Sequence, residues 1–191
     1  MIVIGITGTL GAGKGTVVEY LVKYKKFTHY SVRDFLRKEL EKRQMPVNRD
    51  TLTAIANTLR AKHGSSHIAE QLFSLASASG KHSVIESIRS PGEVHALRSF
   101  PGFFLLAVDA DRRVRYKRIR TRNSETDQVS YQTFLMNEER EMHTNNPNNQ
   151  NLSECIRMAD HIILNNGSQK DLKELTEHFL NHIGYYRQKT Q

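Results

Sequence analysis

Five short apolar runs, rich in β-branched residues, alternate along the chain with longer segments of mixed polarity. The runs predict β-strands at residues 1–7, 27–31, 81–87, 102–109 and 160–165. The fourth run is apolar without interruption from Phe103 to Val108, as in strands that are buried on both faces of a parallel sheet. Because strands alternate with helical segments, we expect a three-layer α/β/α fold with a five-stranded parallel sheet.

The segments between these runs predict helices, because apolar residues recur in them at helical spacing or capping residues precede them. Ser31 and Ser168 are placed as N-caps of two of these helices. We expect helices beginning near Lys14 and after Ser168, and further helices at 32–43, 51–62, 66–78, 91–99, 111–123, 131–143 and 152–158. The polar segments 124–129 and 144–151 lack any periodicity, so we expect loops there.

Length and composition narrow the class of protein. A chain of 191 residues, 38% hydrophobic and 25% charged, suits one globular domain that spans residues 1–191. The single cysteine, Cys155, excludes an internal disulfide framework. The longest apolar run is too short to cross a bilayer, and the first residues form a core strand rather than a signal peptide. We therefore expect a soluble cytoplasmic protein without membrane partners, either a monomer or a homodimer.

A glycine-rich segment, Gly8–Thr16, follows the first predicted strand and opens the first predicted helix. It contains four glycines: Gly8, Gly11, Gly13 and Gly15. Glycines let the backbone adopt positive φ and turn its N–H groups toward an anion, to which the helix adds the positive end of its dipole. Lys14 supplies a cation for the β- and γ-phosphates, and Thr16 supplies a hydroxyl for Mg²⁺. The segment therefore predicts a site for the phosphates of a nucleotide.

The chain is basic, with a formal net charge of +8. Many of the positive charges fall in the predicted helix 111–123: Arg112, Arg113, Arg115, Lys117, Arg118, Arg120 and Arg122. Such a helix can bind a polyphosphate, bind nucleic acid or simply face solvent. Arginines suit phosphate geometry. Only Tyr116 is interleaved as a stacking aromatic, so nucleic-acid binding is the weaker alternative.

Four segments resemble the P-loop nucleoside monophosphate kinase group, which includes adenylate kinases and neighbours the dephospho-CoA kinases. They are Gly8–Thr16, Ser31–Arg37, Glu86–Ser90 and Ala159–Ser168. Residues 58–69 and 88–94 are most similar to a largely archaeal group of kinase-like proteins. Glu86 stands where the kinases have aspartate, and the glycine of their acceptor helix is absent, so the resemblance leaves the acceptor open.

The resemblance implies a P-loop NTPase fold with a helical acceptor-binding insertion at 32–80 and a short basic lid region at 112–143. It implies that ATP phosphates bind to Gly8, Leu10, Gly11, Ala12, Gly13, Lys14, Gly15 and Thr16. The adenine would lie near Asn165 and Gly167, at the turn after the last strand. The arginines that flank the lid, Arg118 and Arg122, would act with Lys14 on the transferred phosphate.

The acceptor's phosphate would meet arginines of the helical region and of the third strand's end: Arg33, Arg37, Arg60 and Arg89. Arg89 follows a strand end, and we also expect it to act in catalysis. Asp34 either completes a capping box with Ser31, or contacts the acceptor as a ligand or a base. Glu86, at the carboxyl end of a strand beside the loop, would hold Mg²⁺ through water, together with Thr16.

These residues predict an ATP- and Mg²⁺-dependent phosphotransferase that moves the γ-phosphate of ATP to a nucleoside or deoxynucleoside monophosphate. Its partners would be nucleotides. Two alternatives stay open. The acceptor could be dephospho-CoA, whose hydroxyl needs a base such as Asp34. The chain could instead be a nucleotide-binding regulatory module, associated with nucleic acid, that transfers phosphate weakly.

Overall fold

A five-stranded parallel sheet with the strand order β2-β3-β1-β4-β5 forms the centre of the protein in the computed structural model, which describes residues 1–122, 129–143 and 150–186. The strands are β1 (Val3–Gly8), β2 (Thr28–Ser31), β3 (Ser83–Glu86), β4 (Phe103–Asp109) and β5 (His161–Leu164). β1 lies in the middle and pairs with β3 on one side and with β4 on the other. The predicted parallel five-stranded sheet is confirmed, with strand ends displaced by at most two residues.

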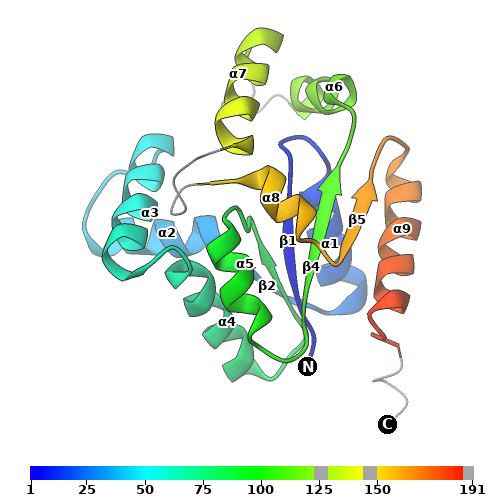
Figure 1. The fold of residues 1–191 in the computed structure, drawn as a ribbon, viewed down its shortest axis with the longest axis horizontal. Helices are drawn as coiled ribbons and strands as arrows, with labels where there is room; N and C mark the ends of the chain where they lie inside the picture. Colours follow the sequence, from blue (N-terminus) through cyan, green and yellow to red (C-terminus); the bar gives the residue numbers. More distant parts are fainter. Residues whose placement is uncertain (123–128, 144–149, 187–191) are drawn as a thin grey trace.

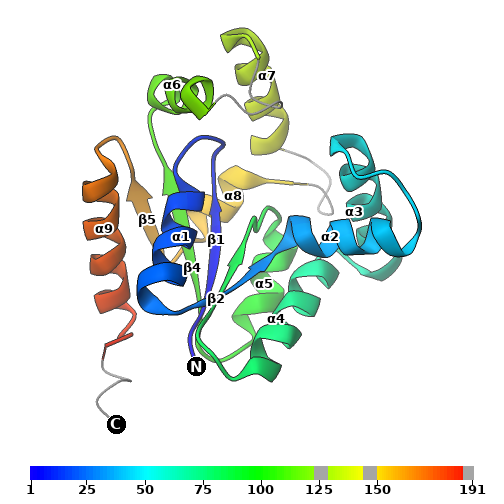
Figure 2. The same cartoon turned by 180° about the vertical axis from the view of Figure 1, so that it is seen from behind.

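Helices cover both faces of the sheet (Figures 1 and 2). They are α1 (Lys14–Lys25), α2 (Val32–Lys42), α3 (Arg49–His63), α4 (His67–Ser79), α5 (Pro91–Arg98), α6 (Arg112–Arg122), α7 (Tyr131–Met142), α8 (Leu152–Arg157) and α9 (Gln169–His182). The alternation of side chains along β1 explains the two apolar cores. Ile4 and Ile6 pack with α1 and α9, whereas Val3 packs with the side chains of α2, α3, α4 and α5. The three-layer α/β/α architecture is therefore confirmed.

Helix ends follow the local sequence. The Ser168 hydroxyl accepts a hydrogen bond from the backbone N–H of Asp171 and caps α9, as predicted. Ser31 caps α2 in the same way, through the N–H of Asp34.

Of the two predicted loops, residues 124–128 and 144–149 lie outside the described residues. Among the residues that the structure describes, no helix is long and apolar enough to cross a membrane.

The register of the sheet brings the candidate chemistry to one edge. Ile6 is paired with Glu86, Gly8 with Val108, and Asp109 with Leu164. The glycine-rich loop, the end of β3, the end of β4 and the turn after β5 therefore meet at the carboxyl ends of the strands, where parallel α/β folds bind their ligands. α6 and α7 lie beyond this edge (Figure 1).

Candidate phosphate-binding site

Three glycines of the loop adopt the backbone conformation that was predicted for them. The φ angles of Gly8, Gly11 and Gly13 are 127°, 80° and 107°. A Cβ on Gly8 would lie 1.9 Å from the carbonyl oxygen of Val108, and a Cβ on Gly13 would lie 2.5 Å from Nδ2 of Asn165. No other residue type fits these positions without displacing the backbone of β4 or the turn after β5.

The prediction of a positive φ was wrong for Gly15. This glycine lies inside α1, which already begins at Lys14, so its backbone is helical. A Cβ at this position would meet no heavy atom within 4 Å. Gly15 therefore leaves open space beside the start of the helix rather than shaping the curl of the loop.

The start of α1 offers N–H groups without the capping side chains found on other helices. Its N-cap, Gly13, has no side chain that accepts a hydrogen bond, and the first turn carries no acidic residue. By contrast, α9 begins with a complete capping box. An uncapped helix N-terminus that follows a curled glycine loop fits an anionic phosphate in both charge and donors.

Lys14 folds back over the loop. Its ammonium Nζ donates hydrogen bonds of 2.7 Å to the carbonyl oxygens of Gly8 and Thr9. Burial, reinforced by the nearby positive charge of Arg89, lowers the pKa of Lys14 to about 7. The carboxylates of Glu86 and Glu141 oppose this shift, so both lie within electrostatic range of the lysine. An anion in the loop would restore the full positive charge of Lys14.

The turn after β5 is tied to the loop and to α6. The buried amide of Asn165 donates from Nδ2 to the carbonyl oxygen of Ala12 at 2.8 Å. Arg118 donates from Nη1 to the carbonyl oxygen of Asn165 at 2.8 Å, and from Nη2 to that of Gly167 at 3.0 Å. The Arg118 guanidinium thus lies against the turn. Its predicted role at the transferred phosphate stays a prediction, as does that of Arg122, an exposed residue in the last turn of α6.

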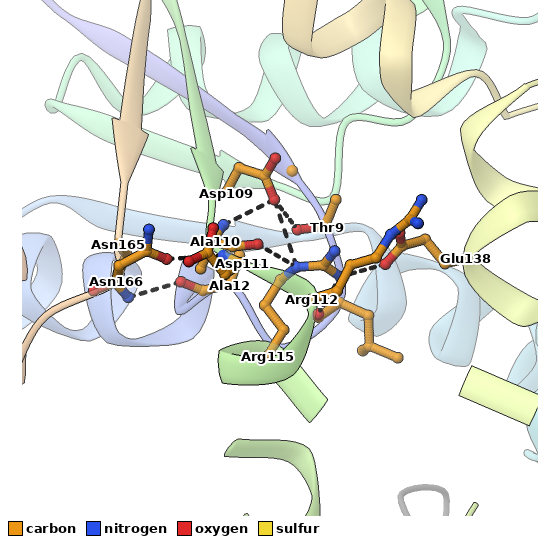
Figure 3. Close-up of polar contacts among 12 residues, drawn as sticks. Thr9, Ala12, Asp109, Ala110, Asp111, Arg112, Arg115, Glu138, Asn165 and Asn166 are labelled. Carbon is orange, nitrogen blue, oxygen red and sulfur yellow. Dashed lines mark hydrogen bonds and ion pairs between the residues drawn. The ribbon is translucent and has the colours of Figure 1, made fainter. Parts of the chain in front are cut away.

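Two residues of the site were missed by sequence reasoning. Arg115 was predicted only as one of the basic residues of the helix, but its side chain is 3% exposed and contacts the loop, β4 and α7. Asp109 accepts hydrogen bonds at Oδ1 from the Thr9 hydroxyl (2.5 Å) and from the backbone N–H of Ala110 (2.8 Å), as Figure 3 shows. The position of Asp109 at the end of an apolar strand was a usable signal, whereas the partner of Arg115 on α7 could not be read from spacing.

Glu86 is an ionised carboxylate at the carboxyl end of β3. Its Oε1 lies 3.5 Å from Nε2 of His29 on the neighbouring strand β2. The hydrogen bond with His29 lowers the pKa of Glu86, although partial burial opposes the shift. Thr16, in the first turn of α1, is partly buried. One hydroxyl and one charged carboxylate beside a phosphate loop are oxygen donors of the type that Mg²⁺ prefers.

Arg89 and Arg60, two residues predicted to bind the acceptor, share one partner at the start of α5, and their role at an acceptor site stays a prediction. The Nη1 atom of Arg89 lies 3.1 Å from Oε2 of Glu141 and 3.1 Å from Oε1 of Gln150. Arg60 is buried, with Nη2 3.4 Å from Oε1 of Glu93, and its Nε has no hydrogen-bond partner among the described residues. The other carboxylate oxygen of Glu93 accepts the backbone N–H of Arg89 at 2.8 Å. Glu93 therefore joins the two arginines.

The remaining predicted acceptor residues lie on the exposed face of α2. Arg33 is exposed, and Nη2 of Arg37 lies 3.3 Å from Oδ1 of Asp34. The predicted capping box forms only in part, because the Asp34 carboxylate pairs with Arg37 instead of returning to the N–H of Ser31. The described contacts of this group are local to α2, so the structure does not bring it into contact with the loop.

Comparison with known proteins places the chain in a family. Residues 4–146 match the AAA_18 family, described as an AAA domain. The UPF0200 protein of Methanothermobacter thermautotrophicus is 32% identical over 94% of this chain and 90% of its own. Two solved structures share the kinase-like P-loop fold. TT1252 from Thermus thermophilus has a TM-score of 0.60 and 20% identity, over 95% of this chain and 97% of that chain. A gluconokinase from Sinorhizobium meliloti 1021 has a TM-score of 0.59 and 14% identity, over 100% of this chain and 97% of that chain. The chain therefore belongs to the AAA_18 family and to the UPF0200 family.

Proposed function

We propose that the protein is an ATP- and Mg²⁺-dependent phosphotransferase whose acceptor is the phosphate of a nucleoside or deoxynucleoside monophosphate. The observation that carries the proposal is the loop between β1 and α1. Left-handed glycines, an uncapped helix N-terminus and the partly buried Lys14 lie together there. Such an arrangement supports binding of the β- and γ-phosphates of a nucleotide.

The position of each residue suggests its part in the proposed reaction. Lys14 would neutralise the transferred phosphate, and Thr16 with Glu86 would hold Mg²⁺, the carboxylate acting through water. The metal ion would neutralise charge that develops on the phosphates. Arg89 would hold the acceptor, because it lies close enough to Lys14 to lower the pKa of the lysine. A phosphate acceptor is already ionised, so positioning and charge suffice and no general base is needed.

The turn at 165–167 would bind the base of ATP. Arg118 holds two carbonyl oxygens of this turn, and Asn165 fastens the turn to the loop at Ala12. The distance between base and phosphate sites is thereby fixed by hydrogen bonds within the protein. This supports a nucleotide, rather than a free polyphosphate, as the donor.

The first test is ADP formation from Mg·ATP with each common ribo- and deoxyribonucleoside monophosphate, and with dephospho-CoA, as the acceptor. Lys14→Ala is the blank, and its thermal melting curve shows whether it is folded. Stimulation by one or two monophosphates would support the proposal and name the acceptor. ATP binding without stimulation by any acceptor would contradict it and favour a regulatory module.

A second candidate, transfer to the hydroxyl of dephospho-CoA, is favoured by the carboxylates near Lys14. Glu86 and Glu141 both influence the pKa of the lysine, so a base is available close to the phosphate site. Asp34, the base expected from the sequence, is exposed and paired with Arg37. If dephospho-CoA alone stimulates turnover, loss of turnover in Glu86→Gln with unchanged affinity for Mg·ATP, and retention of turnover in Asp34→Asn, would identify Glu86 as the base rather than only a holder of the metal ion.

A further inference from the structure

The buried guanidinium of Arg115 links the end of β4, the phosphate loop and α7. Arg115 donates from Nε to the carbonyl oxygen of Ala110 (2.7 Å) and from Nη1 to the carbonyl oxygen of Leu10 (3.3 Å). The same Nη1 is hydrogen-bonded to Oε2 of Glu138 on α7 (Figure 3). The second oxygen of Glu138 accepts from Nε of Arg112 at 2.7 Å. Through Arg115, the end of β4, the phosphate loop and α7 therefore share one hydrogen-bonded centre.

The part of the loop that Arg115 touches has little freedom of its own. Leu10 precedes Gly11, and a Cβ on Gly11 would lie 2.7 Å from the backbone oxygen of Arg115. Thr9 is held by Asp109, whose Oδ1 is itself 3.6 Å from Nε of Arg115. Contacts with α6 and β4 thus hold residues 9–11, and Nζ of Lys14 donates hydrogen bonds to the carbonyl oxygens of Gly8 and Thr9.

The same centre borders the space between the loop and α7. A small pocket, partly open to solvent, is lined by Thr9 and Leu10 of the loop and by Glu138 and Glu141 of α7. The ring of Phe134, one turn before Glu138, lies 5.5 Å below the guanidinium of Arg115. Because the Arg115 guanidinium is buried, its charge must be balanced by a carboxylate, and Glu138 supplies it. A displacement of α7 would therefore disturb the hydrogen bond that Arg115 donates to the carbonyl oxygen of Leu10.

We propose that Arg115 and Glu138 form a positioning pair for the donor nucleotide, through which α7 sets the geometry of the phosphate loop. The inference rests on the proposed function, since it assigns the loop to the phosphates of ATP. Neither residue touches the phosphates in this account. Arg115 holds the carbonyl group of Leu10, and Glu138 holds Arg115.

The test compares the binding of Mg·ATP and of inorganic pyrophosphate in three carboxylate variants. Glu138→Gln keeps the size of the side chain and removes its charge. Glu139→Gln changes the exposed neighbouring residue. Glu177→Gln disrupts a carboxylate that accepts from Tyr20, Lys25 and Tyr186 between α1 and the chain's C-terminal region, and it controls for lost stability. We expect Kd for both ligands to rise on the order of tenfold in Glu138→Gln alone.

A merely structural role would give a different pattern. Melting temperatures would fall in both Glu138→Gln and Glu177→Gln, while Kd measured well below those temperatures stayed within about twofold of wild type; that outcome would overturn the proposal. If Glu138→Gln does not fold, Arg115→Lys keeps a positive charge but lacks the fork that reaches Leu10 and Glu138 together, and the same rise in Kd is expected. Because binding is the readout, a failure of acceptor phosphorylation would refute the proposed function without affecting this test.

Discussion

The lowered pKa of Lys14 predicts that binding of a nucleotide to the loop is coupled to proton uptake. With a pKa of about 7, against an ordinary value of 10.5, the folded protein holds this lysine largely neutral above neutral pH. Between the two values the unfolded chain binds more protons, so the lysine's contribution to stability rises with pH across that window. A phosphate in the loop favours the charged form of Lys14, which becomes scarcer as the pH rises. The affinity for the nucleotide is therefore expected to fall above pH 7.

We therefore expect Mg·ATP binding at pH 8 to take up close to one proton. Calorimetric titration in buffers that differ in ionisation enthalpy measures this uptake. Lys14→Arg is the matched control, because a guanidinium stays charged throughout this range and its binding should release or take up no proton at this position. Equal uptake in both proteins would contradict the assignment to Lys14.

Gly13 and Gly15 provide a matched pair within one loop. Alanine at Gly13 would have a φ of 107° and a Cβ 2.5 Å from Asn165, so we expect a loss of about 1–3 kcal/mol in unfolding free energy. Alanine at Gly15 meets nothing within 4 Å and lies in a helix, so we expect a gain of roughly 0.5–1 kcal/mol. Chemical denaturation of both variants measures the difference, and equal destabilisation would contradict this account.

At the scale of single residues, the sequence predicted those features that depend only on residues nearby in the chain. The curled glycines, the lysine and the capping serines depend on neighbours in the chain. Arg115 could not be assigned, because its burial depends on Glu138, which lies 23 residues further along the chain on another helix. Gly15 was misread because a positive φ was assigned to all four glycines of the loop, although the helix predicted to begin near Lys14 already includes Gly15.

At the scale of elements, two of the three acidic residues of α7 pair with different arginines. Glu138 pairs with Arg115, which contacts the glycine-rich loop, and Glu141, three residues later, pairs with Arg89 at the end of the β3 region. Residues three apart share one face of a helix. The helix predicted at 131–143 is confirmed as α7. Its pairing with Arg115 and with Arg89 could be found only in the tertiary structure.

In the proposed function, Glu141 would compete with the acceptor anion for Arg89. Its Oε2 is 3.1 Å from Nη1 of the arginine, and an incoming phosphate must replace this contact. We expect Glu141→Gln to lower KM for the acceptor by roughly two- to tenfold with kcat less affected, since one partly exposed ion pair is lost. Steady-state kinetics at two salt concentrations measure the change, with Glu139→Gln as control. A higher KM would show that the carboxylate orients Arg89 instead.

At the scale of the whole molecule, a buried ion pair joins the helical region 32–80 to the rest of the protein. Arg60 of α3 and Glu93 of α5 lie 3.4 Å apart in the core, and apolar side chains of α2, α3 and α4 pack in one cluster with those of β3 and β4. A shared core predicts that the two parts unfold together. The sequence indicated the helical region and the sheet, but the ion pair between them depends on the way the helices fold back onto α5.

We therefore expect one cooperative unfolding transition, with equal calorimetric and van't Hoff enthalpies, and a lower midpoint in Glu93→Gln. Removing the charge of Glu93 leaves Arg60 buried without its counter-ion, which costs about 3 kcal/mol and lowers Tm by roughly 6–12 °C in a chain of this size. Glu154→Gln is the control, because its pair with Arg157 is exposed and Tm should hardly change. Two separate transitions in the wild-type protein would show that residues 32–80 form an independent unit.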